Sequence, residues 1–334
     1  MMCCGSWRGV LARVAIVVVL GAAASAEAKE CGGNVACACG DSVRGSATLT
    51  ADLVGCTAGL RVKSNAVLDC AGHAILAAPL DAQEGVVVEG TAATVRDCTV
   101  AGFGTGIRVR GGGANVIADN DVVDSARYGL ELAVQTTHNR ISGNLVTGSG
   151  DEGVHVGSGA DDNVIEGNDI EDEETGVWIG SRMAENQFFM DCSEPAYVSA
   201  FLLRIHRDHA ARNVVRGNRF SRVTYGVRVE DDGARVEGNL FLANDPAARA
   251  VLVGSKWRTI VLGAPVAGVV IESNDAALIG VAAPYRWIHG HADTAFAGNR
   301  AFDAAAGAFG AASLVEGEQP PIDPFLFAID FWRP

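Results

Sequence analysis

The chain has 334 residues, of which 49% are hydrophobic, and its 26 basic and 40 acidic residues give a formal net charge of −14 at pH 7. This composition excludes a disordered tail and a small disulfide scaffold, because there is enough apolar material for a large core. The acidic balance argues against a nucleic-acid partner, which requires clustered Lys and Arg to neutralise phosphates. The 41 glycines and the low aromatic content of 6% indicate many tight turns between short strands.

Residues 1–26 are predicted to be a secretory signal peptide. Arg8 and Arg13 precede an apolar run of about 11 residues, which ends at a small-residue cleavage site around Ala26. The run is too short to span a membrane as a helix, for which roughly 20 residues are needed. Cleavage there removes the two arginines and no acid, which takes the net charge from −14 to −16. We expect a secreted or periplasmic monomer without membrane insertion.

Residues 27–60 are predicted to form a cysteine-rich N-terminal cap. Four of the nine cysteines lie there, at Cys31, Cys37, Cys39 and Cys56. Export permits disulfide bonds. We favour disulfides over a structural zinc site, because no histidine lies nearby and the spacing lacks paired CxxC motifs. The sequence leaves the pairing open.

Residues 61–300 are predicted to be a repeat array. One segment type recurs at starts that differ by 28, 22, 24, 24, 50 and 21 residues, and we interpret the 50 as two periods. Its copies are NAVLDC (65–70), ATVRDC (93–98), NVIADN (115–120), NRISGN (139–144), NVIEGN (163–168), NVVRGN (213–218) and ARVEGN (234–239). The second segment type has the copies GIRV (106–109), GLEL (129–132), GVHV (153–156), GVWI (176–179) and GVRV (226–229). Their period-two alternation is typical of short strands in a solenoid.

The repeat favours a parallel β-helix over two other solenoids. Gly and Asn every few residues would break the helices of an α-helical array, and the inward positions hold Val and Ile where a leucine-rich repeat has Leu. A recurrent asparagine is expected in a β-helix, because stacked rungs allow its side chains to hydrogen-bond in a ladder. The predicted ladder comprises Asn120, Asn144, Asn168, Asn218, Asn239, Asn274 and Asn299.

Three cysteines are expected to take the ladder position in other rungs. Cys70, Cys98 and Cys192 each follow an aspartate, as the last residue of a repeat segment. We interpret them as buried thiols, since cysteine is small and apolar enough for such a turn. The alternative is that two of them, in adjacent rungs, are oxidised to a disulfide.

Four stretches resemble the opening rungs of secreted bacterial proteins with a right-handed parallel β-helix, in the pectate-lyase-like superfamily. They are CGD (39–41), TLTADLVGC (48–56), LDCAGH (68–73) and GFGTGIRV (102–109). The resemblance covers about residues 39–300 and implies an all-β, single-stranded right-handed solenoid of roughly ten rungs, capped at both ends. Residues 301–334 would form the C-terminal cap. The superfamily includes polysaccharide lyases, hydrolases, epimerases, NosD-type periplasmic accessory proteins and adhesins.

The second segment type predicts a column of outward side chains. In a GVHV-type strand the residue between two inward ones points outward, so that consecutive rungs stack their outward residues. An exposed Trp beside charged side chains is typical of a sugar-binding surface, and we expect Trp178, Arg204 and Arg228 to bind a polysaccharide. The alternative is that Trp178 packs beneath a loop. The predicted column contains Val87, Arg108, Glu131, His155, Trp178, Arg204 and Arg228.

Candidate catalytic residues lie in and beside this column. β-Elimination or epimerisation of a uronic acid needs a base, an acid and a positive charge on the carboxylate. His155 or Tyr128 would transfer the protons and Arg108 would neutralise the carboxylate. A glycoside hydrolase would instead use Glu131 and Glu152. No specific catalytic motif accompanies them, so the alternative is a structural, adhesive or NosD-like accessory protein that performs no chemistry.

We expect no cofactor and assign no metal ligands. The sequence leaves calcium open, because acidic residues at 161–162 and 171–174 fall in turns of successive rungs, and carboxylates are the ligands that calcium prefers. It also leaves a transition metal open, because the histidines of HRDH (206–209) and HGH (289–291) are spaced closely enough to share one. The alternative interpretation is a solvated acidic face that keeps the solenoid soluble.

Overall fold

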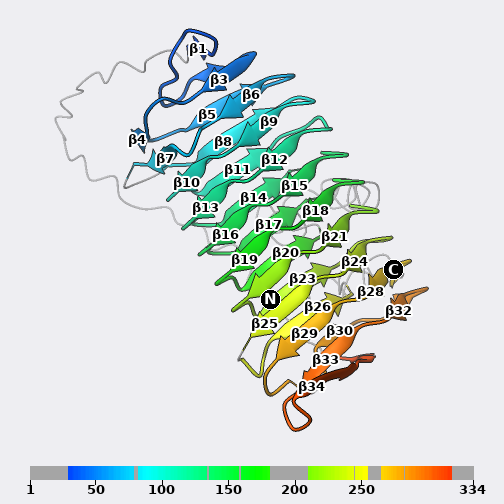
Figure 1. Cartoon of the computed structure of the whole chain (residues 1–334). Helices are drawn as coiled ribbons and strands as arrows, with labels where there is room; N and C mark the ends of the chain where they lie inside the picture. The colour runs from blue at the N-terminus through cyan, green and yellow to red at the C-terminus, as the bar shows by residue number, and fades with distance from the viewer. Residues whose placement is uncertain are drawn as a thin grey trace, which may run out of the picture.

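The structure is a computed structural model that describes residues 29–78, 82–133, 135–157, 159–180, 210–243, 245–254, 265–281 and 283–317. These residues form a right-handed parallel β-solenoid, in which each rung of the winding chain stacks on the previous one (Figure 1). The all-β fold is thereby confirmed. The described ranges contain no helix, and so none that could cross a membrane. The proposed signal peptide, residues 1–26, lies outside them.

Three long sheets form the faces of the solenoid, and their strand numbers agree with roughly ten rungs. The 12-stranded sheet contains, in spatial order, β1 (Glu30–Cys31), β2 (Ser42–Val43), β5 (Leu60–Lys63), β8 (Glu84–Glu89), β11 (Thr105–Val109), β14 (Tyr128–Leu132), β17 (Glu152–Val156), β20 (Thr175–Ile179), β23 (Tyr225–Val229), β26 (Arg249–Val253), β30 (Tyr285–Trp287) and β35 (Leu314–Glu316). The 11-stranded sheet contains β34 (Ala308–Ala311), β33 (Arg300–Asp303), β29 (Asp275–Leu278), β25 (Leu240–Ala243), β22 (Arg219–Ser221), β19 (Asp169–Glu171), β16 (Leu145–Thr147), β13 (Asp121–Val123), β10 (Thr99–Ala101), β7 (Ala74–Ala77) and β4 (Leu53–Cys56). The 10-stranded sheet contains β3 (Ser46–Thr48), β6 (Val67–Asp69), β9 (Thr94–Arg96), β12 (Val116–Ala118), β15 (Arg140–Ser142), β18 (Val164–Glu166), β21 (Val214–Arg216), β24 (Arg235–Glu237), β28 (Val270–Glu272) and β32 (Ala295–Ala297). A small fourth sheet pairs β27 (Val266–Ala267) with β31 (His291–Ala292).

The core is filled by the inward residues of the three sheets. Within one rung, Ile117, Val122 and Leu130 point inward, and each exposes at most 1% of its surface. Ile141 and Val146 lie directly beside the first two of them in the next rung. Branched aliphatic side chains pack well on a pleated surface. The same choice in every rung therefore builds one continuous apolar column along the solenoid axis.

The predicted asparagine ladder is confirmed at the turn between the 10-stranded and 11-stranded sheets. Each side-chain amide donates to the Oδ1 atom of the asparagine in the next rung at 2.9–3.0 Å. The same Oδ1 atom accepts the backbone N–H of the preceding asparagine, as between Asn120 and Asn144 at 3.0 Å. The residue before Asn168 is Gly167, whose φ of 61° lies in the left-handed region that the turn requires. Buried amides satisfied in this way lock the rungs in register.

A second asparagine ladder, which the sequence analysis missed, precedes the strands of the 10-stranded sheet. Asn115 donates through its amide to Asn139 at 2.9 Å, and Asn139 donates to Asn163 at 2.8 Å. The ladder continues from Asn163 to Asn213 at 3.0 Å. These asparagines open the repeat segments that start at residues 115, 139, 163 and 213. The recurrence of Asn at the first position of these segments is the sequence signal for this second ladder.

The N-terminal cysteines form two of the disulfide bonds. Cys31 is bonded to Cys37 and Cys39 to Cys56. The strands of this region join the sheets of the solenoid in parallel, since β2 pairs with β5 and β3 pairs with β6. The cysteine-rich segment therefore continues directly into the stack of rungs.

The expectation of buried free thiols at Cys70 and Cys98 is wrong, because these two cysteines form a third disulfide. Both occupy the ladder position, and the backbone N–H of Cys98 donates to the Oδ1 atom of Asn120 at 3.1 Å. Stacking of adjacent rungs places their Cα atoms 4.7 Å apart, within the range that a disulfide spans. Cys192 lies outside the described residues.

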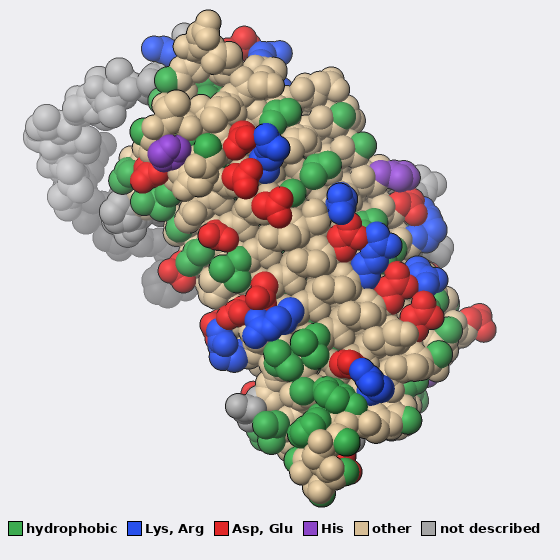
Figure 2. Space-filling model, viewed as in Figure 1, with side chains coloured by type: hydrophobic (Ala, Val, Ile, Leu, Met, Phe, Trp, Pro, Cys, Tyr) green, Lys and Arg blue, Asp and Glu red, His purple; other side chains and the backbone are tan. Residues whose placement is uncertain are grey.

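The C-terminal end departs from the parallel pattern. β34 turns back and pairs antiparallel with β33, whereas the other paired strands in the described ranges are parallel. Hydrophobic side chains gather on the surface at this end (Figure 2), and Phe309 of β34 is exposed. Of the cap predicted for residues 301–334, the structure describes 301–317.

Candidate functional site

The outward residues of the 12-stranded sheet form a column through consecutive rungs. Register places Arg108 of β11 beside Glu131 of β14. His155 of β17 lies between Glu131 and Trp178. Arg228 of β23 pairs directly with Trp178 of β20. Five of the predicted column residues thus come from five adjacent strands.

The predicted place of Arg204 in this column is wrong. No rung separates Trp178 from Arg228, and Asn168 donates directly to Asn218. The spacing of 50 residues is therefore one rung with extra residues and not two periods. The extra residues 181–209, which include Arg204, lie outside the described part of the chain.

A second outward column lies on the same sheet, at the first residue of each strand. Tyr128 pairs with Thr105 on one side and with Glu152 on the other. Glu152 pairs in turn with Thr175, and Thr175 with Tyr225. Because the two columns are parallel, Tyr128 and Glu152 share a patch with the first column. We call Arg108, Tyr128, Glu131, Glu152 and His155 the acid–base cluster.

The centre of the acid–base cluster is a stacked pair of rings. The rings of Tyr128 and His155 lie 4.6 Å apart between centroids and are inclined by only 11°. An Oε atom of Glu152 lies 3.5 Å from Nδ1 of His155. The guanidinium of Arg127 donates to the phenolic oxygen of Tyr128 at 2.9 Å and lies 4.7 Å over its ring. A carboxylate thus faces the imidazole, and a cation stabilises negative charge on the phenol oxygen.

Arg108 connects two carboxylates across three rungs. Its Nε atom lies 3.0 Å from Glu131, and its Nη1 atom donates to Glu84 at 3.1 Å. Arg110 donates to the same oxygen of Glu84 at 2.8 Å. Burial raises the pKa of Glu131 above its usual value, although the positive charge of Arg108 opposes this. Glu131 therefore holds its proton to a higher pH than an ordinary glutamate.

The expectation that Trp178 is exposed is wrong. Its side chain exposes 2% of its surface, and Tyr128, Glu152 and His155 expose at most 5%. The guanidinium of Arg228 lies 4.4 Å from the indole centroid, and the ring of His155 meets the indole edge-on at 5.9 Å. The side chains of Trp178 and His155 thus point outward from the sheet and are nevertheless shielded from solvent. This agrees with the alternative of a packed Trp that the sequence left open.

One carboxyl group of the acidic run 171–174 is buried, at the turn between the 11-stranded and the 12-stranded sheets. Glu173 exposes 3% of its surface and stands two residues after its strand, where neighbouring rungs have Ser125, Ser149 and Val223. Both of its carboxyl oxygens accept the backbone N–H of Ser149 at 3.1 Å. Burial raises the pKa of Glu173 to about 8. The signal that could have revealed it is a glutamate at an otherwise apolar or hydroxyl position.

The acidic turns considered for calcium are occupied by arginines. Asp162 accepts two hydrogen bonds from Arg212 at 2.7 and 2.8 Å. Arg222 donates to both Glu171 and Asp172. Within the described ranges no group of three or more His, Cys, Asp or Glu side chains is arranged to hold a metal ion. Carboxylates in these turns thus neutralise neighbouring arginines, and calcium binding stays an untested prediction.

Comparison with known proteins identifies the family. Residues 84–276, more than half of the chain, match the family described as the right handed beta helix region. The chain belongs to this family. The match begins at β8 and ends within β29. The whole acid–base cluster of this β-helix protein therefore lies within the matched residues. No curated protein sequence matches the chain.

Two solved structures share the fold of this β-helix protein. An alginate lyase from Paenibacillus sp. is 18% identical, with a TM-score of 0.53 over 84% of this chain and 89% of the lyase. The Dettilon tailspike protein is 14% identical, with a TM-score of 0.55 over 83% of this chain. The β-helix protein covers 55% of that tailspike chain. At such low identity the likeness concerns the fold alone.

Proposed function

We propose that this β-helix protein binds a polysaccharide containing uronic acids and cleaves it by β-elimination at the acid–base cluster. The observation that carries the proposal is the stacked pair of Tyr128 and His155, since both groups can exchange protons. Arg108 forms an ion pair with Glu131, which lies in the same strand as Tyr128 and directly beside His155. The guanidinium of Arg108 thus supplies a positive charge near the pair of rings. The alginate lyase of similar fold supports the view that a β-helix can carry such chemistry.

The reaction needs one base, one acid and one cation. One member of the Tyr128–His155 pair removes the proton from C5 of a uronate, and the electron pair forms a double bond between C4 and C5. The bond from C4 to the glycosidic oxygen breaks, and the other member of the pair gives its proton to that oxygen. Arg108 stabilises the negative charge that develops on the uronate carboxylate in the transition state.

The carboxylates of the cluster support these roles. Glu152, at 3.5 Å from Nδ1 of His155, orients the imidazole and stabilises its protonated form. Glu131, whose pKa is raised by burial, keeps Arg108 in place. Epimerisation would use the same proton removal and return the proton to the opposite face of C5, without cleavage. Glycoside hydrolysis by Glu131 and Glu152 would leave no double bond, so the product distinguishes the three reactions.

Burial of the cluster sets a condition for this function. Tyr128, Glu152 and His155 are almost completely buried, and a sugar can reach them only after a rearrangement that exposes the outer face of β14 and β17. A titratable cluster on the outward side of a sheet is unusual for a purely structural surface, because burying ionisable groups there is unfavourable.

A non-catalytic role is the second candidate, favoured by the packing of Trp178. An indole that is 2% exposed and covered by Arg228 is suited to stabilising the solenoid. In that case the protein would be a structural, adhesive or NosD-like accessory β-helix. For either role, three disulfides support a secreted or periplasmic location, since disulfides persist in oxidising compartments.

The decisive experiment incubates the purified protein with alginate and with polygalacturonate. Formation of the C4–C5 double bond is followed by ultraviolet absorbance, and epimerisation is followed by NMR of the recovered polymer. We expect absorbance to rise with one of the polymers, and Tyr128→Phe and His155→Ala each to lower the rate at least 100-fold. Arg61→Ala is the matched control, because Arg61 stands in the same outward column beyond the cluster.

Two results would contradict the proposal. One is a wild-type protein that produces neither double bonds nor epimerised residues from any uronic-acid polymer. The other is activity that survives unchanged in both the Tyr128 and the His155 variants. Release of reducing ends without a double bond would mean that the protein is a glycoside hydrolase that uses Glu131 and Glu152.

A further inference from the structure

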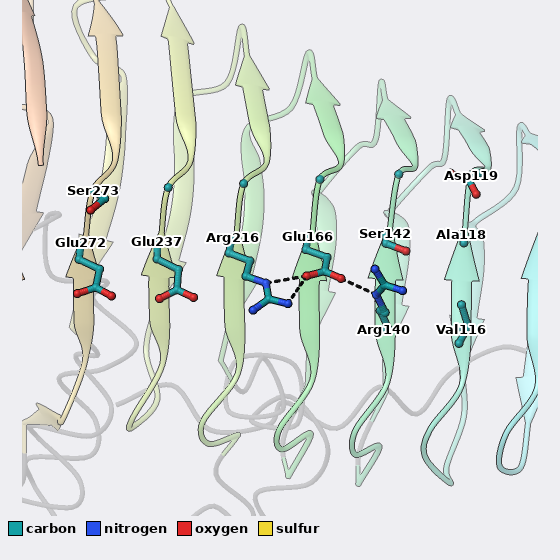
Figure 3. A pocket seen from close by; sticks show the side chains of 14 residues that line it. Val116, Ala118, Asp119, Arg140, Ser142, Glu166, Arg216, Glu237, Glu272 and Ser273 are labelled. Carbon is teal, nitrogen blue, oxygen red and sulfur yellow. Dashed lines mark hydrogen bonds and ion pairs between the residues drawn. The ribbon is translucent and has the colours of Figure 1, made fainter. Parts of the chain in front are cut away.

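A groove runs along the outer face of the 10-stranded sheet (Figure 3). The acid–base cluster lies on the 12-stranded sheet instead. The volume of the groove is about 1040 Å³, and it crosses six adjacent strands from β12 to β28. The groove is open to solvent and follows the axis of the solenoid. Its length and direction suit a linear polymer better than a small ligand.

One side of the groove is a column of outward residues, one from each rung. Register places these residues side by side at the third position of each strand. The opposite side is formed by the turns before the asparagine ladder, where Gly167, Gly217 and Gly238 carry no side chain. A Cβ atom on any of these three glycines would meet no atom within 4 Å. On this side the groove is therefore bounded by backbone alone and is open to solvent. The column consists of Ala118, Ser142, Glu166, Arg216, Glu237 and Glu272.

Charged groups in the middle of the groove hold one another in place. Glu166 accepts a hydrogen bond from Nε of Arg140 at 2.5 Å and another from Nε of Arg216 at 2.6 Å (Figure 3). Both arginines remain more than half exposed, at 59% and 51% of their side chains. Their guanidinium planes are thus fixed from below, and their outer N–H groups are accessible from the groove.

The same balance continues toward the C-terminal rungs. Arg235 donates to Glu237 at 2.8 Å and to Glu272 at 2.9 Å. The lining itself has two guanidinium groups, three glutamates and Asp119, and Arg235 at its edge adds a third guanidinium. Three positive and four negative groups give a formal net charge of −1 over six rungs. So small a charge gives neither a polyanion nor a polycation a strong electrostatic advantage there.

This chemistry matches an uncharged chain of sugars. Adjacent strands lie about 4.8 Å apart, which is close to the advance of an extended pyranose chain per sugar. Each rung then offers fixed donors or acceptors to the hydroxyl groups of one sugar, and charged partners make the stronger hydrogen bonds. We propose that the groove binds a neutral polysaccharide in extended form, parallel to the solenoid axis. This binding is independent of β-elimination at the acid–base cluster.

The test measures binding with one variant that blocks the groove and one that does not. Ser142→Trp places an indole in the groove, in the strand beside Glu166, and removes no charge. Thr147→Trp is the matched control, since Thr147 lies in the next strand of the same rung and faces outward from the 11-stranded sheet. Affinity electrophoresis of the full exported chain would use gels that contain a soluble β-glucan, a galactomannan, polygalacturonate or polylysine.

We expect at least one of the two neutral polymers to retard the wild-type protein and the Thr147 variant equally. The Ser142 variant should bind that polymer at least tenfold more weakly, with an unchanged thermal midpoint. Retardation only by a charged polymer would overturn the proposal, as would equal binding by the Ser142 and Thr147 variants. Because the Tyr128 and His155 variants leave the groove intact, they should bind the neutral polymer normally, which separates this test from that of β-elimination.

Discussion

Two sides of the same rungs are built in opposite ways. At the turn between the 10-stranded and 11-stranded sheets, seven successive positions hold the same residue, and each asparagine bonds to its copy in the next rung. The outward column of the 12-stranded sheet changes at every step, from Arg108 through Glu131 and His155 to Trp178. A position that holds the same residue in every rung thus identifies side chains that hold the rungs together. A position whose residue differs from rung to rung identifies side chains that are available for another role.

Glu173 breaks the repetition inside the core, and we expect the largest effect there. Its pKa is about 8 in the folded protein and about 4.5 in an ordinary glutamate. Because the pKa is higher in the folded than in the unfolded protein, protonation of Glu173 contributes its full stabilisation below pH 4.5. This contribution decreases as the pH rises above 4.5 and is lost above about pH 8. The shift corresponds to on the order of 5 kcal/mol at most. Urea unfolding at several pH values should show that the wild type loses stability relative to Glu173→Gln over this range. Parallel curves for the two proteins would contradict the burial of a neutral acid.

Asn144 tests the repeated side. Its amide donates to Asn168 and to the carbonyl of Ile117, and its Oδ1 atom accepts from Asn120. Asn144→Leu leaves several of these buried groups without a partner, and we expect a loss of about 4 kcal/mol in the free energy of unfolding. Thr147→Leu, on the outside of the same rung, should change the unfolding midpoint little. An equally small change in the Asn144 variant would mean that the ladder does not hold the rungs.

Trp178 tests the variable side. Because the indole is buried and packed against Arg228, Trp178→Ala should lower the free energy of unfolding by about 3 kcal/mol. Arg61→Ala, in the exposed part of the same column, should change it by less than about 0.5 kcal/mol. Thermal and urea unfolding would measure both. A Trp178 variant as stable as the wild type would restore the interpretation of an exposed sugar-stacking residue.

The smallest effect is expected for the arginines of the acidic turns. Arg212 and Asp162 form a bidentate pair that is largely exposed. Arg212→Ala should therefore destabilise by only about 0.5 kcal/mol, and less at high salt. The measurement compares urea unfolding in low and high sodium chloride. A large, salt-insensitive loss would show that these turns are part of the core.

The sequence predicted what repeats and missed what depends on packing. Asn120 and its copies were found because the side-chain period equals the rung, and the neighbours of Glu131 and His155 followed from the same register. The burial of Trp178 could not follow, because alternation distinguishes inward from outward but does not say what covers the outward side. The fate of Cys70 and Cys98 depended on a Cα separation that only the stacked rungs reveal.

Glu173 and the groove were missed for related reasons. A glutamate within the acidic run 171–174 resembles its solvated neighbours in composition, although it alone enters the core. The groove depends on the order in which Arg140, Glu166 and Arg216 meet across three rungs. Arg140 and Arg216 are 76 positions apart in the sequence. The extra residues 181–209 lengthen one rung to about two periods, so the sequence does not indicate that Glu166 and Arg216 lie in adjacent rungs.

In the part of the chain that the structure describes, the three disulfides lie between Cys31 and Cys98, and no cysteine follows Cys192 in the sequence. In a stack where each rung contacts only its neighbours, loss of structure spreads from an end. The covalent bonds fasten one end, so heat or a protease should strip rungs from the C-terminal side first. Under such attack the molecule would shorten step by step toward a resistant stub that retains the cross-linked opening rungs.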